Sequence, residues 1–115
     1  IVTAGKVNIA ALITDAGVKM THMAVGTGTT AVNAGDTTLG TENDRNALSV
    51  SGGAPSSNTI VYTGVWAAGD GTAAITEAGL FSASSSGTML ARTVFSAVNK
   101  GASDVLTITW TVTIS

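Results

Sequence analysis

The fold is decided by ten residues, 106–115, which read LTITWTVTIS. Successive side chains of a β-strand point to opposite faces, so this strict alternation predicts a strand with one apolar face of Leu, Ile, Trp and Val in a core. The other face, from Thr107 to Ser115, is a ladder of hydroxyl groups. Such a ladder suits either a solvated sheet face or a contact with another subunit.

Further strands are expected upstream, because β-branched and apolar runs alternate with turn-forming residues. The dipeptide Asp70-Gly71 is typical of a tight turn and predicts a hairpin between residues 59–66 and 74–81. The segments 52–58 and 82–87 are expected to be turns or loops, and 99–101 a turn. The remaining strands are expected at residues 20–25, 47–51 and 88–95.

One helix is expected, over residues 3–14, with Thr3 as its N-cap and Gly17 ending it. Its apolar positions Ile9, Leu12 and Ile13 lie at helical spacing and should dock on a sheet. The sequence thus predicts a mainly β protein: an antiparallel β-sandwich, or a barrel-like variant, with one short N-terminal α-helix. It should form a single domain over residues 1–115.

Residues 31–46 contain several turn formers and little to bury except Val32 and Leu39, so they are expected to form an extended loop or arm. We interpret this arm as the place where a partner protein is contacted, the alternative being a mobile solvent loop. Deleting it is expected to leave the fold intact and to abolish binding to the partner. The expected contact residues are Val32, Asp36, Leu39, Glu42, Asp44 and Arg45.

The composition narrows the range of functions that the protein can have. Of 115 residues, 44% are hydrophobic, which is enough for one core, whereas only 10% are charged and the net charge is −2. A nucleic-acid-binding domain normally carries a basic stripe, so direct binding of nucleic acid is not expected. No cysteine is present, and no apolar run is long enough for a membrane-spanning helix. Low charge favours a protein that is assembled with partners or exposed outside the cell.

Catalytic chemistry is weakly supported. His22 is the only histidine, and it lies in a predicted strand without the Gly-x-Ser-x-Gly motif of many serine hydrolases. Most acidic residues lie in predicted turns, but Glu77 falls inside a predicted strand. A structural ion pair of Glu77 with Arg92 or Arg45 is favoured over a catalytic acid. The sequence therefore predicts that the protein is not an enzyme.

Three places are candidates for binding a small ligand. A calcium site built from Asp36, Glu42 and Asp44 is conceivable, but their spacing matches no EF-hand, and no metal or other cofactor is expected. The run GTGTTA, residues 26–31, lacks the following helix of a dinucleotide site, so its glycines are interpreted as allowing a sharp chain reversal. Trp110 is expected in the core, whereas Trp66 leaves open a carbohydrate-binding module.

Several short motifs resemble a known family. THMAVGTG (residues 21–28), LGTENDR (39–45), ITEAGLF (75–81) and MLAR (89–92) together resemble the N-terminal domain of phage tail-collar fibre proteins. The stretch VFSAVNK (94–100) and the threonine ladder are similar to small stand-alone phage structural proteins described as tail-fibre-like. This resemblance implies a structural protein of a tailed-phage virion without enzymatic activity.

Within that class, a small unit with few charges and a hydroxyl-rich sheet favours a capsid decoration or cement protein on the exterior surface of the particle. The partner would be the major capsid protein, and the resemblance implies a homo-oligomer, with a trimer favoured. The alternative is a tail-fibre or collar attachment protein, whose partner would be a tail or baseplate protein. Neither nucleic acid nor a membrane is expected as a partner.

Overall fold

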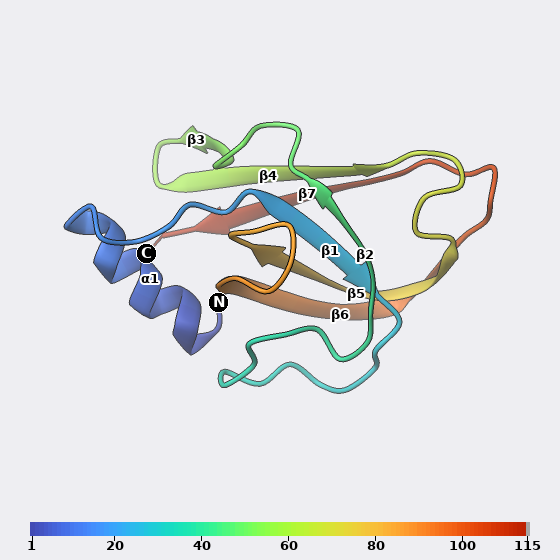
Figure 1. Ribbon diagram of the computed structural model, residues 1–115, viewed down its shortest axis with the longest axis horizontal. Coiled ribbons are helices and arrows are strands. Elements are labelled where there is room, and N and C mark those ends of the chain that lie inside the picture. The colour runs from blue at the N-terminus through green and yellow to red at the C-terminus, as the bar shows by residue number, and fades with distance from the viewer. Residues whose placement is uncertain (115) are drawn as a thin grey trace.

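The computed structural model describes residues 1–114, which form one α-helix and seven β-strands (Figure 1). All pairing is antiparallel, and the strands form a four-stranded sheet of order β2-β1-β5-β6 and a three-stranded sheet of order β3-β4-β7. The predicted fold class, mainly β with two antiparallel sheets and one short N-terminal helix, is confirmed. The elements are α1 (Thr3–Ile13), β1 (His22–Gly26), β2 (Glu42–Ala47), β3 (Ala54–Ser56), β4 (Thr59–Trp66), β5 (Ala73–Phe81), β6 (Met89–Lys100) and β7 (Leu106–Thr113).

The core lies between the two sheets and follows the period-two pattern. On β7, Thr107, Thr109 and Thr111 are exposed, while the alternate residues are partly or fully buried, as the sequence predicts. The last hydroxyl of the predicted ladder, Ser115, lies outside the described residues. The largest fully buried apolar side chains are Trp66, Phe81, Met23, Ile75, Leu80, Met89, Val2 and Val25.

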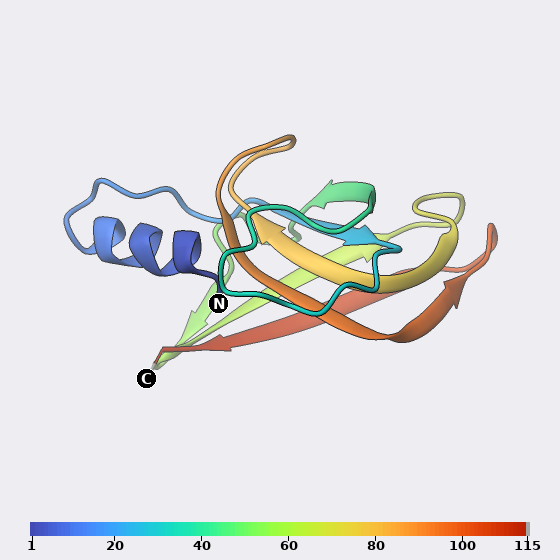
Figure 2. The ribbon, with the colours of Figure 1, turned by 90° about the horizontal axis from the view of Figure 1, so that it is seen from below.

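Helix α1 lies at one end of the sandwich and packs on β6 (Figures 1 and 2). Its N-cap is Val2, with no side-chain cap, so the prediction that Thr3 caps the helix is wrong. The docked side is only partly the predicted one: Ile9 packs against the core, but Leu12 and Ile13 are exposed, and Gly5 is buried. A Cβ at Gly5 would lie 2.3 Å from a β6 carbonyl oxygen, so contact through glycine brings the helix backbone close to the sheet.

The C-terminal end of α1 also differs from the prediction. The helix ends at Ile13, and the chain turns at Asp15, whose φ is +60°, before Gly17 is reached. The Asn8 side chain then holds the next segment, because it donates to the Val18 carbonyl at 2.6 Å and accepts from the Val18 N–H at 2.8 Å. The helix in residues 1–114 is not long and apolar enough to cross a membrane.

The predicted hairpin between β4 and β5 is wrong. β4 pairs with β3 and β7, whereas β5 pairs with β1 and β6 in the other sheet. A turn is present, with the Asp70 N–H donating to the Ala67 carbonyl at 3.0 Å, but it carries the chain from one sheet to the other. Trp66 on β4 and Ile75 on β5 are both completely buried. The two strands therefore bury their apolar faces across the core instead of pairing side by side.

Other boundaries also depart from the sequence prediction, and one short strand, β3, lies inside the segment 52–58 that was expected to be a turn or loop. Residues 42–46 of the predicted arm, together with Ala47, form the edge strand β2 and pair with β1, because their backbone gains partners there in spite of the polar side chains. Residues 48–51 are not a strand, although Leu48 is buried. β6 continues to Lys100, so the predicted turn at 99–101 begins at Gly101, where Gly101 and Asp104 hydrogen bond to each other.

Candidate functional site

A buried carboxylate, that of Glu77, is the centre of the polar interior. Glu77 lies on β5 and is completely inaccessible to solvent. Its Oε2 accepts the backbone N–H groups of Gly28 at 2.7 Å and Thr41 at 2.8 Å. Its Oε1 accepts the backbone N–H of Gly40 at 2.8 Å and the Nε of Arg92 at 3.0 Å. Four donors therefore satisfy a charge that would otherwise be very costly to bury.

Arg92, on β6, connects this carboxylate to the long loop 27–41. Besides Glu77, its guanidinium contacts Asp36 Oδ2 at 3.1 Å and donates to the Thr30 carbonyl at 2.9 Å. The Arg92 side chain is only 2% exposed. We call Glu77, Arg92, Asp36 and the three backbone amides of Gly28, Gly40 and Thr41 the Glu77 hub. It ties the loop to the four-stranded sheet at both of its ends and in its middle.

The glycines of the GTG run make room for this hub. A Cβ on Gly28 would lie 2.3 Å from Glu77 Oε2, and a Cβ on Gly26 would lie 2.3 Å from the Thr41 carbonyl oxygen. Neither glycine has a positive φ. The interpretation that they allow a chain reversal is therefore wrong: they are needed because backbone and carboxylate approach closely. The Thr76 hydroxyl adds a 2.7 Å hydrogen bond to the Gly28 carbonyl.

The hub also sets the ionisation of Glu77. Burial by itself would raise the pKa of this carboxyl, but the hydrogen bonds from Thr41, Gly40, Arg92 and Gly28 outweigh it. The pKa of Glu77 is consequently lowered from its ordinary value of 4.5. The ionised form is thus the one that the fold stabilises.

The lowered pKa of Glu77 gives an expected acid dependence. A carboxyl with a depressed pKa contributes stability that is complete above its unfolded-state pKa, here about 4.5, and is lost as the pH falls through the lower folded-state value. The free energies of unfolding of wild type and Glu77→Gln should therefore converge in acid, measured by urea denaturation at a series of pH values. A parallel series for Glu42→Gln is the control. A difference between wild type and Glu77→Gln that does not change with pH would contradict this role.

Six residues were predicted to contact a partner protein, and in the structure they pack against the domain itself to different degrees. Val32 is 47% exposed, whereas Leu39 is buried in an apolar cluster with Ala24, Phe81 and Met89. Asp36 belongs to the hub. The loop is therefore bound to the sandwich, and the expectation that residues 31–46 can be deleted without harm to the fold is wrong, because deletion removes β2 and part of the hub.

The remaining three contact residues lie on β2. Glu42 and Arg45 form a bidentate pair, with distances of 2.7 and 3.0 Å. Arg45 also stacks on the Phe81 ring, 3.7 Å from its centroid, and its side chain is only 8% exposed, so it lies against the sheet rather than projecting into solvent. Asp44 is partly exposed, with one buried carboxylate oxygen that has no partner among the described residues. Contact of these side chains with another protein stays a prediction.

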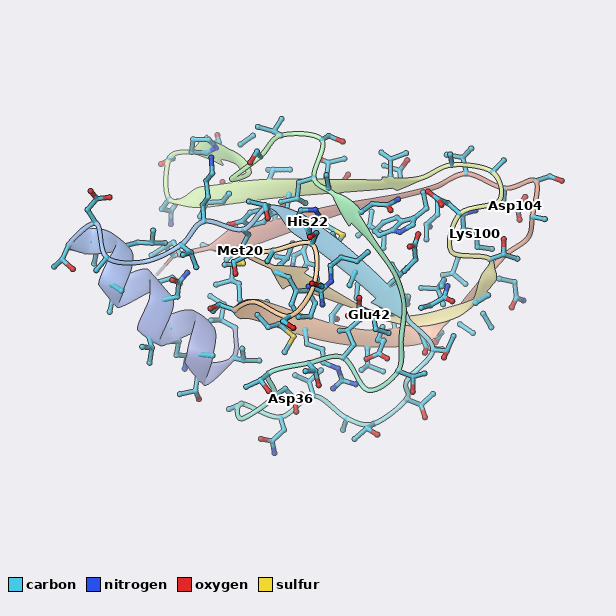
Figure 3. All side chains as sticks on the ribbon, viewed as in Figure 1. Met20, His22, Asp36, Glu42, Lys100 and Asp104 are labelled. Carbon is cyan, nitrogen blue, oxygen red and sulfur yellow. The ribbon has the colours of Figure 1, made fainter. Side chains whose placement is uncertain are left out.

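The arrangement of side chains in residues 1–114 does not support the catalytic or metal-binding alternatives. Asp36 and Glu42 pair with different arginines and lie apart, as Figure 3 shows. Within residues 1–114 no group of three His, Cys, Asp or Glu side chains is placed to hold a metal ion. His22 is partly buried, and its Nδ1 hydrogen bonds with the Thr21 hydroxyl at 2.8 Å.

Of the two tryptophans, Trp66 departs from its expected role, whereas Trp110 packs against the core as expected. Trp66 is completely buried in the core, so it cannot stack on a sugar, whereas Trp110 is only partly buried. Trp110 lines an open, mainly apolar groove between β6 and β7. The residues that line this groove are Ile75, Ala78, Thr93, Phe95, Val98, Leu106, Thr107, Ile108, Thr109, Trp110 and Thr111.

The sequence predicted a paired Glu77 and left its partner open between Arg92 and Arg45, and the structure shows Arg92. Asp36 as the second anion and the amides of the loop were not predicted. The runs Gly-Thr-Gly at 26–28 and Gly-Thr at 40–41 signal only that the backbone can approach another group closely there, not which group it approaches. Comparison of the chain with protein-family models, with curated proteins and with solved structures finds no match.

Proposed function

We propose that the chain is a non-enzymatic structural protein of a tailed-phage virion. One observation carries the proposal: the motifs that resemble phage tail-collar fibre proteins meet in space at the Glu77 hub. Each motif supplies a part of it. The parts are Gly28 from THMAVGTG, Gly40 and Thr41 from LGTENDR, Glu77 from ITEAGLF, and Arg92 from MLAR.

The hub itself favours a structural role over chemistry. Four groups of this chain donate hydrogen bonds to Glu77, which is held ionised without access to solvent. A general acid or base must instead reach a substrate proton. What the hub does is fix a long loop in one conformation, which preorganises a surface for binding without an entropic cost at each contact.

Among virion proteins, we favour a capsid decoration or cement subunit on the exterior of the particle, bound as a homo-oligomer, with a trimer favoured, to the lattice of the major capsid protein. A subunit that binds only the assembled lattice stabilises it by mass action and needs no cofactor. The small size, the low charge and the exposed threonines of β7 support this role. A tail-fibre or collar attachment protein is the alternative that the same motifs support.

The number of copies per particle tests both levels of this proposal. Purified particles of a phage that encodes the chain should contain it in hundreds of copies if it decorates the head, measured by quantitative mass spectrometry against the major capsid protein. A handful of copies would exclude the decoration role in favour of the tail. Particles that lack the chain altogether would overturn the virion proposal.

A further inference from the structure

The sheets have two kinds of edge. On one side of the sandwich the outer strands are protected: β2 carries Glu42, Asp44 and Arg45, and β3 is three residues long and contains Pro55. Charges, prolines and short strands are the usual means by which proteins prevent a sheet edge from pairing with another chain. The edges of β6 and β7 lie along the opposite margin, as Figure 2 shows, and they carry no charge or proline from Thr93 to Asn99 and from Leu106 to Thr113. β7 is the more regular of the two edges, because the β5–β6 ladder has a register shift opposite residues 94–98.

Half of the backbone N–H and carbonyl groups of β7 point to the open side, where they could pair with another strand. The Ile114 N–H donates to the Asn58 carbonyl, so the even-numbered residues of this regular ladder face β4. The N–H and carbonyl groups of Thr107, Thr109 and Thr111 therefore point away from β4, to a side where the described residues place no partner strand. The ladder of β7 with β4 has no register shift over eight residues, which leaves a straight edge about 27 Å long.

The open side is also neutral and apolar. None of the twelve charged residues of the chain lies in 93–99 or 105–114. The groove between the two free edges is lined by Phe95, Leu106, Ile108 and Trp110 among others, and Val98 is 44% exposed. A partner with charges would have to desolvate them here, whereas a surface that is equally uncharged pays no such penalty.

We propose that this open side, the free edges of β6 and β7 with the groove between them, binds a second copy of the chain. The open side of another copy is the one surface known from the structure to match it in neutrality and in free strand edges. Pairing of β7 in one copy with β6 in the next, closed into a symmetric assembly, would satisfy both edges of every copy and cover the groove. This deepens the homo-oligomer of the proposed function, but it rests on the edges alone.

The test removes one hydrogen bond donor from the open edge. Thr109→Pro deletes an N–H that points away from β4 and leaves the β4 ladder intact, while Thr109→Val keeps the N–H and loses only the hydroxyl. Sedimentation velocity should give a wild-type mass that is a multiple of 11.3 kDa. Thr109→Val should keep that mass, and Thr109→Pro should fall to the mass of one chain with an unchanged far-ultraviolet circular dichroism spectrum.

A second pair of variants keeps the test decisive if Thr109→Pro does not fold. Thr107→Lys puts a charge on the edge, whereas Val65→Lys puts it directly opposite on β4, one strand inward. Only Thr107→Lys should dissociate the assembly. A wild-type monomer at every concentration, which would leave the open side for a strand of a different protein, overturns the proposal, as do edge variants that stay assembled. The copy number on particles fails or succeeds independently of this result.

Discussion

Replacing Glu77 with Gln should lower the free energy of unfolding by about 3–5 kcal/mol, the usual cost of breaking a buried ion pair by removing one partner. The Arg92 guanidinium would stay buried with Asp36 as its remaining anion. The new amide group would in addition present donors to a site already lined by the N–H groups of Gly28, Gly40 and Thr41. Urea denaturation followed by tryptophan fluorescence measures the change.

The chain contains a matched control for this substitution. Glu42 also pairs with an arginine, Arg45, but the Glu42 side chain is 37% exposed. Glu42→Gln should therefore cost about 1 kcal/mol or less. Equal losses for the two variants would show that burial and the loop amides add nothing to the pair, and the structural role of the hub would then be lost.

Replacing Trp66 with Ala should also lower the free energy of unfolding by about 3–5 kcal/mol, because a completely buried indole is removed from the middle of the core. The core around it includes Met23, Tyr62 and Ile75. A cavity of this size cannot be filled by small movements of close-packed neighbours. The midpoint of thermal or urea unfolding should fall accordingly.

Trp110→Ala is the control for size and chemistry, since the same atoms are removed from a partly buried position on the groove wall. It should cost less than half as much in the isolated domain. If Trp110→Ala proved the more destabilising of the two, the packing described for Trp66 would be incorrect.

The elements that the sequence predicts best are those whose own side chains decide the structure. β4 is dense in β-branched and aromatic residues and has the predicted bounds, and β7, which alternates without interruption, begins at the predicted residue and ends at Thr113. Glu77 could be recognised because an acid inside an apolar strand must be paired when it is buried. Local pattern and burial agree at these positions.

The errors arise where distant partners decide. The Asp70-Gly71 turn is real, but nothing local distinguishes a hairpin from a crossing between sheets, which is decided by the pairing of β4 with β7 and of β5 with β1 and β6. β2 was missed because its polar side chains pair through the backbone with β1. The side of α1 that docks is set by Gly5 and Asn8, residues that a search for apolar spacing passes over.

The hub was only half predictable for a similar reason. A carboxylate inside a strand predicts an ion pair with an arginine, but the choice of Arg92 over Arg45 depends on β5 and β6 being neighbours. The three backbone donors have no side-chain signature, and the glycines that admit them look like ordinary turn residues. Close approach of backbone to a buried charge is a tertiary property that becomes visible only in three dimensions.

The claim on which the account depends is that the loop 27–41, although it has little regular structure, is held by a buried carboxylate. Hydrogen exchange of the Gly28, Gly40 and Thr41 amides, followed by nuclear magnetic resonance, tests it directly. We expect these three amides to exchange nearly as slowly as those of the central strands, because all of them donate to Glu77. Exchange at the rate of an unstructured peptide would contradict the account.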